Sequence, residues 1–330
     1  MARNYYFFVI VTVIFTVIQN LLIMVASKRM FPNIFPLGEL PEEKRRAVIS
    51  DVKSIFLHRF GAVISRPIDN VVISAFMGLD AVAAYGNYYY VYTTVAGIPA
   101  IIYSTMMGGF GNRIHTESRE ENFKLFMHVE RTVGIIIIFC AAMMLALYQP
   151  FIKVWMGQKH GTLALHFLMP VLMVLYFYVN QSRQVLLTFK AAAGLWREDR
   201  WKPVVGGAVK LLICLLFIRI MPDTFKLDGV ILSSLIGYIF VQIPWESHVV
   251  FTRFFDREQA RAYWRHQLVF ALLGLIPCAA ALGAVRAIPL DGVRGLIVQG
   301  ISAFAVTAVI MLILFRGDLK EMLQKALRRS

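Results

Sequence analysis

Charged and amide side chains interrupt one of the most apolar stretches of the chain, residues 55–78. This stretch contains Arg59, Arg66, Asp69 and Asn70. At a helical spacing of about 100° per residue, Arg59, Arg66 and Asn70 share one face. A guanidinium stays charged at any working pH and pairs with two oxygens of a phosphate. We therefore expect this face to line a water-filled cavity that attracts an anionic group such as a pyrophosphate.

Other interpretations of these cations stay open. Arg66 and Asp69 are three residues apart and would form an ion pair within one helix. Arg59 lies nearer the end of the stretch and would extend to the membrane surface, as we expect of Lys210 in a later stretch. Pro67 removes a backbone donor directly after Arg66, which predicts a bent helix.

A second polar face occurs in the stretch 164–188. It combines Tyr176, Asn180, Arg183 and Gln184 at helical spacing. Hydrogen bonding between neighbouring helices is one explanation of this face. The other is that Asn180 and Arg183 line the same cavity as Arg59, Arg66, Asp69 and Asn70, which would make these six residues the candidate substrate-binding set.

Sequence motifs of common enzymes are not visible. There is no Asp-x-Asp pair, no His-Glu-x-x-His, no Gly-x-Ser-x-Gly and no phosphate-binding glycine loop. The histidines form no pairs at helical spacing, and the three cysteines fall inside apolar stretches, where they act as small hydrophobic residues. We expect no catalytic residues, no metal and no cofactor.

The composition predicts how these polar groups are held. Of the 330 residues, 58% are hydrophobic and 16% are charged, and the mean hydropathy is +0.64. A soluble domain carries about 25% charged residues. The sequence therefore predicts an all-α polytopic membrane protein of about nine transmembrane helices. The expected spans are 5–26, 55–78, 84–107, 131–149, 164–188, 203–221, 229–251, 267–285 and 295–315.

The basic residues predict the orientation. Segments 27–54, 108–131, 190–202, 252–266 and 316–330 each carry four to six Lys or Arg residues, whereas the alternate segments carry two at most. By the positive-inside rule, the N-terminus lies outside, the C-terminus lies in the cytoplasm and the membrane is the inner one. The net charge of +14 then reflects topology, and nucleic acid is not an expected partner. Trp196, Trp201 and Trp264 are expected to mark the inner interface.

The longest connection, 27–54, contains a predicted surface helix. Pro41 and two glutamates suit a first helical turn, and Glu42 and Arg46 stand at the spacing of an ion pair. We expect the helix over 41–54 to lie on the inner membrane face.

One predicted outer segment reads Pro150-Phe-Ile-Lys-Val-Trp-Met-Gly157, and one predicted inner segment reads Gly194-Leu-Trp-Arg-Glu-Asp-Arg-Trp-Lys-Pro203. Together with several other segments, and in the same order, they resemble the C-terminal lobe of Wzx-type polysaccharide flippases of the multidrug/oligosaccharidyl-lipid/polysaccharide (MOP) exporter superfamily. The resemblance covers most of residues 1–255. The matching segments are 56–63, 69–79, 82–90, 111–118, 150–157, 194–203 and 244–246.

The resemblance implies a V-shaped fold of two six-helix lobes, often with two added helices, related to the MATE (multidrug and toxin extrusion) transporters. It also implies alternating-access transport of an undecaprenyl-pyrophosphate-linked oligosaccharide, as in O-antigen and lipopolysaccharide synthesis. Implied divisions are a single helix of the N-terminal lobe at 1–27, a linker at 28–54, the C-terminal lobe at 55–255, and two added helices with a basic tail at 256–330.

On this scheme most of the N-terminal lobe is absent, so we expect a truncated gene, a degenerate copy or half of a split gene. In the last case a separately encoded N-terminal lobe would be a partner, beside the lipid-linked oligosaccharide and membrane lipids. The pair Arg66–Pro67 departs from the small and polar residues expected there.

Two alternatives stay open. A drug antiporter of the same superfamily would need carboxylates deep in its spans. In this sequence Asp69 is the only carboxylate expected deep in a span, and arginines dominate there. A glycan polymerase or ligase would need a large outer loop, and the outer loops here are short.

Overall fold

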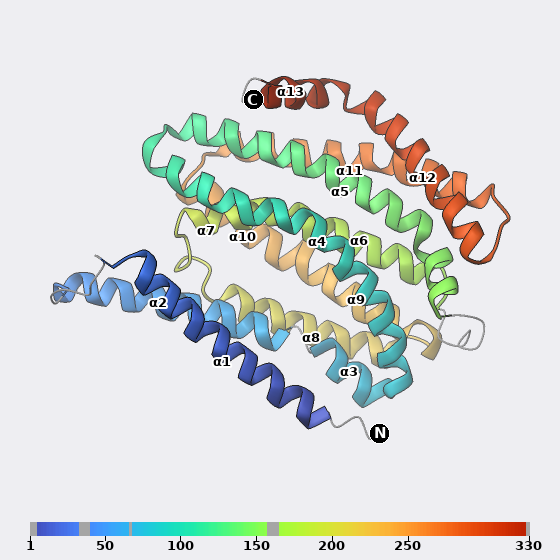
Figure 1. The fold of residues 1–330 in the computed structure, drawn as a ribbon, viewed down its shortest axis with the longest axis horizontal. Helices are drawn as coiled ribbons and strands as arrows, with labels where there is room; N and C mark the ends of the chain where they lie inside the picture. The colour runs from blue at the N-terminus through green and yellow to red at the C-terminus, as the bar shows by residue number, and fades with distance from the viewer. Residues whose placement is uncertain (1–4, 33–39, 66–67, 157–164, 328–330) are drawn as a thin grey trace. The chain divides into compact units, whose positions relative to one another are not determined.

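A computed structural model describes residues 5–32, 40–65, 68–156 and 165–327, and within these ranges all regular structure is helical (Figure 1). The chain divides into two compact units, Met1–Ile49 and Ser50–Ser330. We describe each unit by itself.

The first unit contains helix α1, Tyr5–Met30, and the start of helix α2, Glu42–Ser65. The segment Val9–Met30 has a mean hydropathy of 2.5, as expected of a membrane span. In α2, Arg46 donates to Glu42 over 3.0 Å, which confirms the predicted pair. The predicted surface helix over 41–54 does not end at 54, because α2 continues without a break to Ser65.

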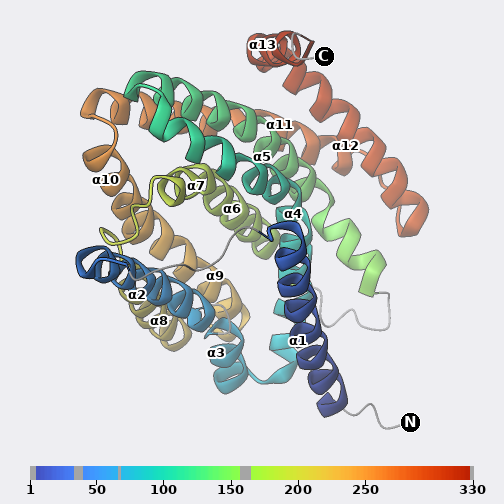
Figure 2. The ribbon, with the colours of Figure 1, turned by 60° about the vertical axis from the view of Figure 1, so that its left-hand side comes forward.

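The second unit is a helical bundle (Figure 2), and helix α5, Arg119–Met156, packs against several of its other helices. Its other helices are α3 Ile68–Met77, α4 Leu79–Thr116, α6 Leu168–Ser182, α7 Gln184–Ala192, α8 Lys202–Ile220, α9 Lys226–Gly237, α10 Ile243–Arg253, α11 Arg257–Arg286, α12 Gly292–Leu314 and α13 Arg316–Leu327. Helices α4, α6, α7, α11, α12 and α13 all contact α5. Short η segments cover Asp223–Phe225 (3₁₀) and Tyr238–Gln242 (π).

Helix α5 has buried side chains on more than one face, and different faces belong to different hydrophobic clusters. Small residues of α5, α11 and α12 form one cluster, in which Ala142, Ala281 and Ala303 are fully buried. Small side chains allow close approach of membrane helices. An aromatic cluster forms elsewhere, where the Phe189 ring of α7 lies 5.5 Å from that of Phe126 in α5. This cluster anchors α7 beside the charged groups described below.

Within the described residues, six helical segments are long and apolar enough to cross a membrane, so the expected count of nine is not confirmed. The six segments are Val9–Met30, Arg119–Met156, Lys202–Ile220, Asp223–Arg253, Arg257–Arg286 and Gly292–Leu314.

Three expected spans differ from continuous apolar helices. The span 55–78 contains the end of α2 and the ten residues of α3, and the span 164–188 is divided between α6 and α7. The span 84–107 lies inside α4, where the tyrosines lower the mean hydropathy. The long apolar helices nevertheless indicate a membrane-embedded protein.

Candidate functional site

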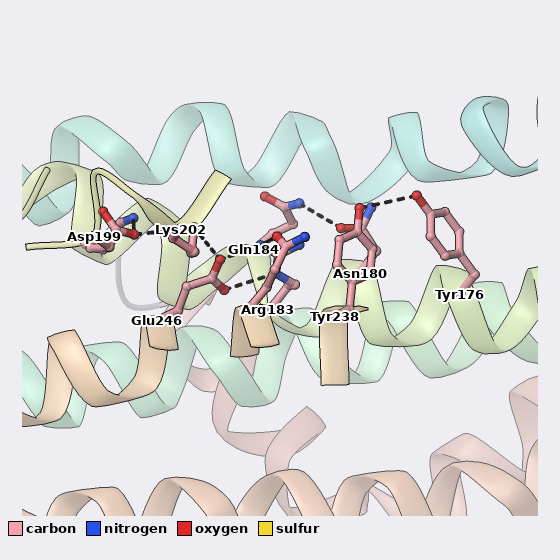
Figure 3. A network of polar contacts seen from close by, with 10 residues as sticks. Tyr176, Asn180, Arg183, Gln184, Asp199, Lys202, Tyr238 and Glu246 are labelled. Atoms are coloured by element: carbon pink, nitrogen blue, oxygen red, sulfur yellow. Dashed lines mark hydrogen bonds and ion pairs between the residues drawn. The ribbon is translucent and has the colours of Figure 1, made fainter. Parts of the chain in front are cut away.

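Arg183 lies at the junction of α6 and α7, where it is the C-cap residue of α6 and the N-cap residue of α7. Its guanidinium points at Glu246 of α10 (Figure 3). The Arg183 Nε donates to Glu246 Oε2 over 3.0 Å, and Nη2 contacts Glu246 Oε1 and donates to Gln242 Oε1 over 2.8 Å. The Glu246 side chain is fully buried. The pair therefore joins two interrupted helices in the bundle interior.

A second cation shares the same carboxylate. The Lys202 Nζ, at the start of α8, lies 2.5 Å from Glu246 Oε1 and 3.4 Å from Asp199 Oδ2. Asp199 also forms an ion pair with Lys190 of α7. All five side chains are buried, and they alternate in charge as Arg183, Glu246, Lys202, Asp199 and Lys190. We name this group the ion-pair network.

The network carries three cations and two carboxylates, so it has an excess positive charge. Burial and the nearby Lys202 together lower the pKa of Lys190 to about 8, whereas Asp199 acts in the opposite direction. The Lys190 nitrogen also lies 5.4 Å from the centre of the Trp196 ring. The excess charge therefore depends on Lys190, and the network attracts a further anion only while Lys190 is protonated.

The backbone is irregular on both sides of Arg183 and Glu246. The helix of α6 is interrupted at Arg183, and a π segment, Tyr238–Gln242, separates α9 from α10. Gln242, which accepts from Arg183, is the last residue of that segment. π segments occur frequently at functional sites, and interrupted helices occur at the binding sites of transporters.

Polar side chains continue from the network along α6. The Asn180 amide donates to the Tyr92 hydroxyl of α4 over 2.6 Å, and the Tyr176 and Tyr238 hydroxyls are 3.3 Å apart. The Arg183 guanidinium lies 4.6 Å from the centre of the Tyr238 ring. Hydrogen bonding between helices, one of the two explanations of this face, is therefore present. Cavity lining by Asn180 and Arg183 stays a prediction.

A separate polar contact joins three helices around Asp69. The Lys210 Nζ of α8 lies 2.8 Å from Asp69 Oδ1 and 2.9 Å from Oδ2, and the Tyr85 hydroxyl of α4 donates to Oδ2 over 3.2 Å. The expectation that Lys210 extends to the membrane surface is wrong, because the buried carboxylate of Asp69 holds its ammonium inside the bundle.

The six predicted binding residues are only partly described. Arg66 lies outside the described residues, and Arg59 belongs to α2 without a described side chain. Asn70 is exposed on α3 next to the buried Asp69. Helices α3 and α6 both contact α4 and α9, so Asp69 and Arg183 belong to neighbouring parts of one bundle.

Sequence reasoning missed the partners of Arg183. Glu246, Lys202, Asp199 and Lys190 were not among the predicted residues. A signal for Glu246 was present, because it is the acidic residue inside the apolar stretch 229–251. A carboxylate inside a membrane span is expected to pair with a buried cation, and Arg183 is the arginine inside the stretch 164–188, so the two residues could have been matched.

Within the described residues, no group of three or more His, Cys, Asp and Glu side chains is placed so that it could hold a metal ion. The geometry instead offers buried cations, shared carboxylates and interrupted helices. Comparisons of the chain with family models, with curated proteins and with solved structures find no match.

Proposed function

We propose that this protein is a polytopic inner-membrane carrier that moves a lipid-linked pyrophosphate oligosaccharide to the outer leaflet. The observation that carries the proposal is the ion-pair network at two interrupted helices. Arg183 and Glu246 lie in predicted spans, and the other three members lie in the predicted inner segment 190–202, so the network is at the proposed cytoplasmic end of the bundle. Ionisable groups are costly at such buried positions and usually belong to a substrate or ion pathway. The order of segments resembling Wzx-type flippases supports the same class of substrate.

The proposed topology has nine spans, with the N-terminus outside and the C-terminus in the cytoplasm. In this arrangement α2 with α3, α4, and α6 with α7 cross the membrane beside the six long apolar segments. Helices that are short or polar are tolerated where they line a cavity or pack inside the bundle. The alternation of basic segments supports this arrangement.

The proposed mechanism uses competition between anions. Glu246 neutralises Arg183 in the described state. A pyrophosphate offers more negative charge than one carboxylate, so a pyrophosphate bound in the cavity would compete with Glu246 for the guanidinium. Movement of α10 away from the α6–α7 junction would follow, because Gln242 and Glu246 lie on the same side of that junction. Arg66 would attract the pyrophosphate from the membrane surface into the cavity.

The test uses the purified full chain in lipid vesicles, alone and together with a separately expressed N-terminal lobe. The probe is a polyprenyl-pyrophosphate oligosaccharide, whose binding and appearance in the other leaflet are both measured. Arg66→Ala is expected to lower both by roughly tenfold, because a hydrogen bond to a charged group contributes about 1.5–3 kcal/mol. Lys53→Ala, in the preceding basic segment, is the control and should keep wild-type values.

Binding of the pyrophosphate lipid no tighter than that of a neutral polyprenol, together with unchanged leaflet exchange, would refute the proposal. Wild-type values in Arg66→Ala would exclude a role of Arg66 in anion binding and leave the membrane topology intact.

A cation-coupled drug exporter is a second candidate, favoured by a buried carboxylate in α5. Glu130 is 3% exposed, accepts from Gln267 over 3.2 Å through Oε2, and has no hydrogen-bond partner for Oε1. A carboxyl group in this setting is suited to exchange of a proton. Proton-driven uptake of an organic cation by the same vesicles, lost in Glu130→Gln, would favour this function over the first.

A further inference from the structure

A second site contains none of the six predicted binding residues and is lined by parts of α5, α11 and α13. A cavity of about 740 Å³ opens there. Its wall includes Lys124, His128 and Arg131 of α5 and Arg265 and His266 of α11. A volume of this size suits a small amphiphilic molecule. We name it the α5–α11 cavity.

The wall changes from basic to apolar along α11. Arg265 is the cation that α11 contributes to one part of the cavity, and Val269, Phe270 and Leu273 line it one to two helical turns further on. By the rise of about 1.5 Å per residue, the distance from Arg265 to Leu273 along the helix is about 12 Å. A ligand that fits this wall has an anionic end and an apolar end.

The position along α11 fits the level of lipid headgroups. Trp264, directly before Arg265, is 44% exposed, and Leu268 and Leu272 are exposed on the same helix. Tryptophan collects at the membrane interface, and exposed leucines face lipid. The cavity thus places its cations at the interface and its apolar floor deeper in the membrane.

Helix α13 covers part of the cavity only weakly. Its Asp318 lies 4.0 Å from Arg131, and its Glu321 lies 3.8 Å from His128. These pairs are partly exposed and long, and such pairs contribute about 0–1 kcal/mol. The cations are therefore still able to bind a phosphate, and Lys124 and Arg265 are in neither of these two pairs.

We propose that the α5–α11 cavity binds an anionic glycerophospholipid, with the phosphate at the basic wall and an acyl chain against Phe270 and Leu273. Basic pockets between transmembrane helices at the cytoplasmic side bind anionic headgroups in this way. The proposal is independent of the transported substrate.

The experiment measures lipid retention by the full chain in detergent, using native mass spectrometry. Phosphatidylglycerol is the probe, with phosphatidylcholine and soluble glycerol phosphate as separate arms. Lys124→Gln with Arg265→Gln is expected to weaken phosphatidylglycerol binding by roughly 25-fold, because each basic residue near an anionic surface contributes a factor of about five. Both residues are exposed, so the bundle is expected to fold, which thermal unfolding verifies.

The matched control is Arg257→Gln with Arg261→Gln. These arginines are exposed on the same helix, on the same predicted membrane side, and do not line the cavity. The control should retain wild-type binding. An equal loss in both double variants would show general attraction by basic segments and overturn the proposal. Equal retention of the two phospholipids by the wild type, or full displacement of phosphatidylglycerol by glycerol phosphate, would also overturn it.

Discussion

Glu246 carries a negative charge that two buried cations share. Arg183 and Lys202 both contact its carboxylate, which is fully enclosed by the bundle. A buried ion pair adds little net stability, because desolvation offsets the attraction between the charges. Removal of one partner is different, because the remaining charge stays buried without compensation. The stability of the network therefore depends more on its completeness than on any single contact.

Glu246→Gln tests this dependence. The amide keeps the size of the side chain but leaves Arg183 and Lys202 with reduced compensation. We expect the free energy of unfolding to fall by about 3–5 kcal/mol, the cost of breaking a buried pair. Thermal unfolding of the full chain in detergent measures the change.

Glu258→Gln is the matched control on exposed α11 surface, where we expect a change within about 0.5 kcal/mol. The double variant Arg183→Gln with Glu246→Gln should lose less unfolding free energy than the two single variants lose in sum. Each single variant leaves one charge of the pair buried without its partner, and the double variant leaves neither. Strict additivity would contradict direct coupling between the two side chains.

At the level of helices, the turn between α11 and α12 depends on a close backbone approach. Gln299 of α12 donates to the carbonyls of Ile288 and Leu290 over 3.0 and 3.1 Å. Gly295 lies so near this turn that a Cβ atom built on it would be 2.2 Å from the Leu290 carbonyl oxygen. That distance is impossible without movement of the backbone.

Gly295→Ala is therefore expected to lower the thermal midpoint of unfolding, although alanine ordinarily favours a helix over glycine by about 1 kcal/mol. We expect a loss of about 1–3 kcal/mol, as for other overpacked sites. Gly300→Ala on the same helix is the control, since its nearest neighbour would be 4.0 Å away, and it should be neutral or stabilising. An unchanged midpoint in Gly295→Ala would contradict the described turn.

The sequence predicted some helices closely and failed at others for identifiable reasons. The span 203–221 agrees with α8, Lys202–Ile220, because a long apolar run leaves little choice. The division at Arg183 was not predicted, since neither proline nor glycine marks it. The π segment was missed because one added residue barely changes the apolar pattern of a buried helix.

The candidate site was harder to predict than the helices. The polar residues of α6 were recognised from their spacing, but their partners come from α4, α8 and α10. Lys210 and Asp69 are 141 residues apart, and no periodicity relates positions at that separation. Pairing across a bundle depends on tertiary packing, which a local pattern does not contain.

For the whole molecule, the alternation of basic segments predicts which loops face the cytoplasm. Asp223 lies in a predicted outer segment with a side chain that is 94% exposed, and Glu198 is exposed in a predicted inner segment. In a variant without Cys140, Cys214 and Cys278, an impermeant thiol reagent added to intact spheroplasts should label Asp223→Cys and spare Glu198→Cys.

Permeabilised spheroplasts provide the control, in which both introduced cysteines should react. Labelling of Glu198→Cys in intact spheroplasts, with protection of Asp223→Cys, would reverse the proposed orientation. Labelling of both positions in intact spheroplasts would contradict an odd number of crossings between them.

The π segment Tyr238–Gln242 has a consequence for evolution of this chain by insertion and deletion. A π turn holds one residue more than an α turn, and each residue advances a helix by about 100°. Loss of one residue from the segment would let it close as an α turn, so α10 would keep nearly the same phase and Glu246 would still face Arg183. Loss of one residue elsewhere in α9 or α10 would instead turn the helix beyond it by about 100°, so the π segment is the place where this helical segment tolerates a change of length.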